Sequence, residues 1–71
     1  MDIDIKIKLG KRIKELRSRK KITQEKLADS ASIDYKYLQT IEGKTPPNVK
    51  IETLEKIAKA LDIKLSYLLD L

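Results

Sequence analysis

The 71-residue sequence contains no cysteine and no histidine. Their absence excludes disulfide bonds, the usual zinc sites and nucleophilic catalysis by either side chain. No apolar run approaches the roughly 18–20 residues that a membrane-spanning helix requires. The acidic start, Met-Asp-Ile-Asp-Ile-Lys, lacks the basic-then-apolar order of a signal peptide. The composition permits a cytoplasmic location, and we expect a cytoplasmic protein that makes no membrane contact.

The short length also argues against an enzyme. A chain of this size forms a single domain over residues 1–71 and buries only about 60% of the surface of its unfolded form, which leaves no room for both a core and a deep cleft. Asp29 and Asp34 are the one carboxylate pair that suggests a catalytic site, and Asp34 is better explained as a helix cap. We expect no catalytic residues, no cofactor and no bound metal.

The charge is unevenly distributed along the chain. The formal net charge is +5, with a pI of about 9.5, which suits a polyanionic partner. Residues 1–21 contain nine lysines and arginines against three acids, whereas residues 22–42 contain two lysines against four acids. The central third is therefore acidic, and the excess positive charge lies mainly before it.

Apolar residues recur at helical spacing in five segments, which predicts an all-α protein. The predicted helices span about residues 5–19, 24–30, 35–42, 51–61 and 65–69, and the fourth is expected to point Ile51, Leu54, Ile57, Ala58 and Leu61 inward. The alternation of Ile3, Ile5 and Ile7 leaves open a short extended arm at the start. Residues 43–48, with Gly43 and two prolines, form the clearest loop.

Residues 23–42 are typical of two short helices joined by a tight turn. Thr23 and Asp34 are placed to cap the two helices through their side-chain oxygens. Buried positions are expected at Leu27, Ala28, Ile33, Leu38 and Ile41, which leaves Tyr35, Lys36, Gln39 and Thr40 on the outer face of the second helix. A helix-turn-helix presents such a face to the DNA major groove, where lysine suits guanine and glutamine suits adenine. We predict base contacts by these four side chains.

Four motifs then indicate a family. Residues 9–17 (LGKRIKELR), 23–28 (TQEKLA), 41–42 (IE) and 54–61 (LEKIAKAL) resemble the phage repressor/Cro-like helix-turn-helix family of the xenobiotic-response-element type. The chain is also similar to small restriction–modification controller proteins and to some antitoxins. The resemblance implies a compact five-helix bundle of the lambda-repressor-like type. It also implies a transcriptional regulator, a repressor or controller that binds double-stranded DNA at an inverted-repeat operator as a homodimer in the nucleoid.

The resemblance implies further roles. The glutamine that opens the first helix of the motif contacts a phosphate in this family, and here it is Gln24; the phosphate contact from the following loop corresponds to Lys44. Arg17 and Glu42 match a structural ion pair. Ser32 and Lys21 replace the family's glycines, and both positions are expected to adopt a left-handed backbone. Lys50 and Lys64 replace a capping serine.

The apolar C-terminal end has two interpretations. Tyr37 is expected to be structural, whereas Leu65, Tyr67, Leu68, Leu69 and Leu71 form either a satellite of the core or, as we predict, a dimer interface. The alternative function is a protein-interaction module on the same fold, such as the antitoxin of a toxin–antitoxin pair. RNA binding is disfavoured because single-strand readers usually offer several exposed aromatic side chains, and this chain has three tyrosines in all.

Overall fold

The computed structural model describes residues 2–71, with side chains from Ile5 onward, and within that range it contains helices and no strand. The helices are α1 (Asp2–Arg19), α2 (Gln24–Ala31), α3 (Tyr35–Ile41), α4 (Ile51–Ala60) and α5 (Leu65–Leu68). The all-α, five-helix prediction is confirmed. Since α1 already includes residue 2, the alternative of an extended arm over residues 3–7 is wrong.

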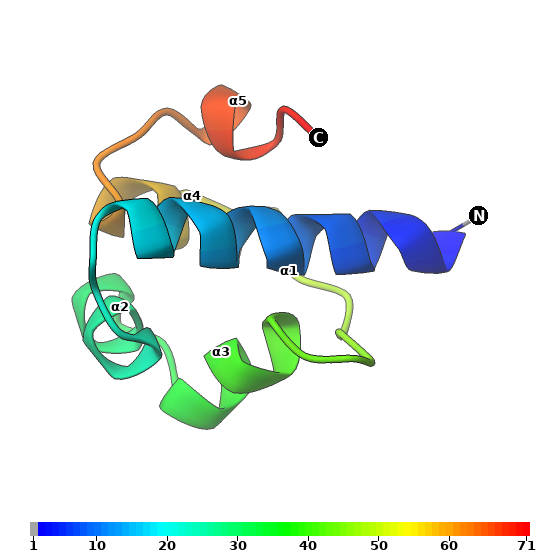
Figure 1. The fold of residues 1–71 in the computed structure, drawn as a ribbon, viewed down its shortest axis with the longest axis horizontal. Coiled ribbons are helices and arrows are strands. Elements are labelled where there is room, and N and C mark those ends of the chain that lie inside the picture. Colours follow the sequence, from blue (N-terminus) through cyan, green and yellow to red (C-terminus); the bar gives the residue numbers. More distant parts are fainter. Residues whose placement is uncertain (1) are drawn as a thin grey trace.

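Helix α1 crosses the whole molecule, with α2 and α3 on one side of it and α5 on the other (Figure 1). Helix α2 packs against α3 and α4, and α4 packs against α5. All five helices contribute to one core, whose fully buried large side chains are Ile13, Leu27, Leu38, Ile41, Ile57, Leu61 and Leu68. Burying each contributes about 1.5–3 kcal/mol. Because helices shorter than about 12–15 residues are marginal alone, this shared core is what stabilises α2 to α5.

The helix ends follow the capping chemistry of the sequence. Thr23 Oγ1 accepts a hydrogen bond from the Lys26 amide at 3.0 Å, and Asp34 Oδ2 accepts one from the Tyr37 amide at 3.3 Å, so both predicted caps are confirmed. Within residues 2–71, Lys50 and Lys64 precede α4 and α5 without a side-chain cap. The lysines at these two positions therefore do not replace the hydrogen bond that a capping serine would make.

Three helices end in the left-handed conformation without a glycine. Lys21 and Ser32 both have φ of 57°, as predicted, and Asp62 has the same φ, which was not predicted. After α2 the Ser32 amide bonds to the Asp29 carbonyl and the Ile33 amide to the Ala28 carbonyl, the pattern of a Schellman motif. The left-handed region costs a residue with a Cβ about 1–2 kcal/mol, so all three ends are strained.

Two burial predictions are wrong. Ile51 was expected to point inward but is 55% exposed, because it begins α4 and lies one turn before the first buried residue of that helix, Leu54. Leu68 was expected at a dimer interface but is fully buried in the core of its own chain. Tyr37 is half-buried against the core, as its structural role requires. No helix in the described part of the chain is long and apolar enough to cross a membrane.

Candidate nucleic-acid interface

Helix α3 separates its apolar and polar side chains onto opposite faces. Leu38 and Ile41 are buried in the shared core. The side chains predicted to contact bases are all exposed: Tyr35, Lys36, Gln39 and Thr40. Tyr35 leads the helix and leaves 42% of its surface to solvent. Thr40 is partly committed, because its hydroxyl donates to the Lys36 carbonyl at 2.9 Å. The exposed face of α3 thus offers a ring, an ammonium and a free amide, and we call Tyr35, Lys36 and Gln39 the α3 surface.

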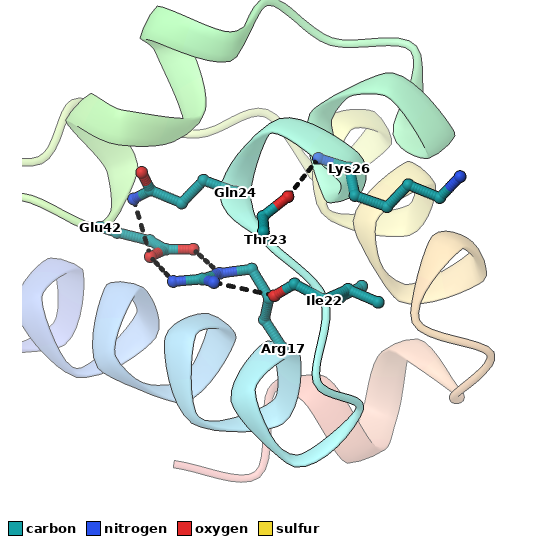
Figure 2. A network of polar contacts seen from close by, with 6 residues as sticks. All are labelled: Arg17, Ile22, Thr23, Gln24, Lys26 and Glu42. Atoms are coloured by element: carbon teal, nitrogen blue, oxygen red, sulfur yellow. Dashed lines mark hydrogen bonds and ion pairs between the residues drawn. The ribbon is translucent and has the colours of Figure 1, made fainter.

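A buried ion pair fixes the C-terminal end of α3 to α1. Arg17 donates from Nε to Glu42 Oε2 at 3.0 Å and from Nη2 to Oε1 at 2.9 Å. Its remaining Nη1 donates to the Ile22 carbonyl at 3.0 Å, which ties down the segment before α2 (Figure 2). Only 2% of the Glu42 side chain is exposed. The predicted structural pair is confirmed, and its two-point geometry sets the position of α3.

Gln24 belongs to the same network. Its Nε2 donates to Glu42 Oε1 at 3.0 Å, so one carboxylate oxygen accepts from both Arg17 and Gln24 (Figure 2). The side-chain amide of glutamine carries two donor hydrogens, and this bond uses one of them. The sequence resemblance assigned Gln24 a phosphate contact but did not reveal its structural bond to Glu42. The structure therefore gives Gln24 a fixed orientation at the N-terminus of α2.

Lys44 lies in the loop between α3 and α4, next to a groove that sequence reasoning did not identify. The lining residues come from α1 and from this loop: Ile7, Lys11, Lys14, Glu42, Gly43 and Lys44. The excess of lysine and arginine in residues 1–21 was the available signal. It did not point to individual side chains, because the placement of α1 beside the loop is a tertiary feature.

The C-terminal end retains an apolar surface after Leu68 is assigned to the core. Tyr67, Leu69 and Leu71 are 45%, 36% and 44% exposed, while Leu65 is half-buried against the core. Arg12 holds α5 against α1: its Nη2 donates to the Tyr67 carbonyl at 2.7 Å, and its guanidinium lies 4.6 Å from the centre of the Tyr67 ring. We call Tyr67, Leu69 and Leu71 the C-terminal surface.

Gly10 is a packing residue next to the site, and the sequence interpretation treated it only as part of a motif. It is buried where α1 crosses the end of α3, and a Cβ built on it would collide with the Ile41 carbonyl oxygen. A glycine inside an otherwise amphipathic helix was the sequence signal. The close approach of the two backbones brings Glu42 within reach of Arg17.

Known proteins resemble this chain in sequence and fold. Residues 10–71 match the model of a helix-turn-helix domain family. The chain is 37% identical over 62 residues to the HTH-type transcriptional regulator SinR of Bacillus subtilis (strain 168), covering 87% of this chain and 56% of SinR. It is 35% identical over 71 residues to the control protein C.BamHI of Bacillus amyloliquefaciens, covering 99% of this chain and 86% of that protein.

A solved structure of a controller protein has the same fold as this chain. The controller C.Esp1396I bound to a 19-base-pair DNA duplex superposes with a TM-score of 0.83 at 33% identity, covering 90% of this chain and 84% of that one. The resemblance inferred from the motifs is thereby confirmed. This chain spans little more than half the length of SinR but most of the length of the control proteins.

Proposed function

The chain belongs to the helix-turn-helix domain family, and on this premise we propose that it is a sequence-specific, double-stranded DNA-binding transcriptional regulator of the cytoplasm. The observation that supports the proposal most directly is the exposed α3 surface on a helix whose far end is fixed by the ion pair of Arg17 and Glu42. A helix held in one orientation presents the same donors and acceptors to every duplex, which sequence discrimination requires.

In the proposed complex, α3 enters the major groove. Lys36 suits O6 and N7 of guanine and Gln39 suits N6 and N7 of adenine, while Tyr35 contacts base edges or the groove wall at the start of the helix. The Thr40 hydroxyl donates its hydrogen to the Lys36 carbonyl, so Thr40 can contact DNA only as an acceptor or through its methyl group. C.Esp1396I, which has a similar fold, has a solved structure in which it is bound to a DNA duplex.

Gln24 and Lys44 would hold the phosphate backbone on either side of α3. The second amide hydrogen of Gln24 is available to a phosphate oxygen, in an orientation set by its bond to Glu42. The N-terminus of α2 adds unpaired backbone donors and a favourable dipole. Lys44 is exposed in the α3–α4 loop and supplies a charge. These contacts position the protein, whereas the α3 surface specifies the sequence.

We further propose a homodimer formed through the C-terminal surface. Three large apolar side chains at one end of so small a domain favour an isologous contact with a second copy. A dimer would place two α3 helices in successive major grooves, about 34 Å apart. Occupancy of an inverted-repeat operator would then repress or control transcription.

A randomised-DNA selection with the purified protein tests this function. The expected result is an enriched half-site repeated as an inverted pair, with centres about 10 base pairs apart or a multiple of that distance. Enrichment of single half-sites would refute the dimer but keep the DNA-binding function. A pool that remains random after several rounds would refute sequence-specific binding.

The second candidate is a protein-interaction module, such as an antitoxin that neutralises a toxin. The exposed C-terminal surface favours it, because the same apolar side chains could cover a partner protein. SinR, part of which resembles this chain in fold, has a solved structure in complex with the protein SinI. This candidate predicts tight binding to a protein partner, with an affinity that does not depend on salt concentration. DNA binding, in contrast, depends steeply on salt.

A further inference from the structure

We propose that the groove between α1 and the α3–α4 loop is a second phosphate-binding site, in which Lys11 and Lys14 bind DNA phosphates in addition to the phosphate bound by Lys44. This inference rests on the proposed DNA-binding function and adds a specific part of the ligand to it. Lys11 and Lys14 are exposed on successive turns of α1, and Lys44 comes from a loop thirty residues later in the chain. All three line the same groove.

The charge distribution supports an anionic occupant. Residues 22–42, which include α2 and α3, have a net charge of −2, so the helix-turn-helix alone would repel a polyanion. Residues 1–21 have a net charge of +6. Figure 1 shows the loop after α3 returning alongside the N-terminal half of α1. This arrangement brings lysines from the basic segment next to the helix that is proposed to contact bases.

Among the described residues that line the groove, the one carboxylate does not oppose an anion strongly. Glu42 lines the groove, but both of its oxygens accept hydrogen bonds from Arg17, and one of them also accepts from Gln24. Its negative charge is therefore neutralised at contact distance by a guanidinium. Ile7 supplies an apolar wall to the same groove. The groove thus combines three ammonium groups with a compensated acid, which suits consecutive phosphates better than a metal ion or a cationic ligand.

A matched pair of double variants tests the proposal. Lys11→Gln with Lys14→Gln removes two charges from the groove, and Lys56→Gln with Lys59→Gln removes two charges at the same three-residue spacing from α4. Lys56 and Lys59 line a different hollow, beside Ser30 and Ala31. All four lysines are exposed, so both variants should retain the wild-type circular dichroism and melting curve. The probes are the duplex obtained by selection and a random duplex of the same length.

The groove variant should have a salt dependence about two units shallower than the wild type, since each phosphate contact contributes about 0.9 to the slope. When the salt concentration is raised from 50 to 200 mM, the factor by which the affinity of the groove variant falls should be roughly ten times smaller than that of the wild type. At a given salt concentration, the affinity that the groove variant loses relative to the wild type should be equal on selected and random duplexes, because phosphates contain no sequence information. The α4 variant should keep the wild-type slope.

Neutral methylphosphonates introduced one at a time would locate the contact. At the phosphates that Lys11 and Lys14 contact, a methylphosphonate should weaken DNA binding by the wild type but not by the groove variant. These phosphates should adjoin the phosphate that the same comparison with Lys44→Ala assigns to Lys44. If the groove variant and the α4 variant have the same slope while the wild type still prefers its selected duplex, the inference fails and the proposed function survives. If the wild type binds neither duplex, both fail.

Discussion

Arg17 and Glu42 lie 25 residues apart in the sequence and form a two-point ion pair that is almost closed to water. Breaking one partner leaves a buried charge without compensation, which costs about 3–5 kcal/mol. We expect Arg17→Met and Glu42→Gln each to lower the free energy of unfolding by about that amount, a large part of the stability of a small domain. Urea denaturation followed by circular dichroism measures both losses.

The double variant distinguishes an interacting pair from two independent residues. With both charges removed, no charge is stranded, so the loss should be smaller than the sum of the two single losses. Strictly additive losses would contradict the coupling that the geometry indicates.

Ser32→Gly should stabilise the protein. Ser32 has a φ of 57°, which costs a residue with a Cβ about 1–2 kcal/mol, whereas glycine adopts it freely at an entropic cost of about 0.5–1 kcal/mol. We expect a net gain of about 0.5 kcal/mol from these terms, measured by the urea midpoint. Ser30→Gly is the control, because the same change inside α2 should destabilise.

Gly10→Ala should destabilise even though alanine favours helix. The new Cβ would meet the Ile41 carbonyl, and overpacking of this kind costs about 1–3 kcal/mol. Ser18→Ala, at an exposed site of the same helix, should leave the thermal midpoint unchanged or raise it slightly. An unchanged midpoint for Gly10→Ala would mean that α1 and α3 do not approach so closely.

The α3 surface should determine sequence preference. Tyr35→Ala and Gln39→Ala should each cost about 1–3 kcal/mol on the selected duplex and almost nothing on a random one, as fluorescence anisotropy would measure. Lys44→Ala serves as the contrast, because it should weaken both duplexes and reduce the salt slope by about one unit. Unchanged discrimination in both α3 variants would show that another element contacts the bases.

The C-terminal surface should control dimerisation. Leu69 and Leu71 are exposed, so the variant Leu69→Glu with Leu71→Glu should keep its helical circular dichroism while sedimenting as a monomer. Leu68→Glu should instead unfold the domain, because Leu68 is fully buried. A wild type that is monomeric at high micromolar concentration and on DNA would refute the proposed dimer.

Local chemistry was predictable where a residue acts within its own element. Thr23 and Asp34 are helix caps by residue type and position. The left-handed helix ends at Lys21 and Ser32 were predicted from the resemblance, because the family has glycines at these two positions. The pair of Arg17 and Glu42 came from a resemblance in the motifs rather than from spacing. Asp62 gave no such signal, because nothing in its immediate sequence marks the end of α4.

By itself the sequence determined the five helices, since apolar periodicity and capping residues act over one or two turns. Only the tertiary structure decided which apolar side chains face the core and which face solvent at helix ends. Leu68 and Leu69 sit at the end of a four-residue helix, too short for periodicity to tell them apart, and the packing of α5 on α4 buries the first. Packing likewise placed Gln24 on Glu42 and brought Lys11 and Lys14 beside Lys44, because no sequence interval records the distance between two helices.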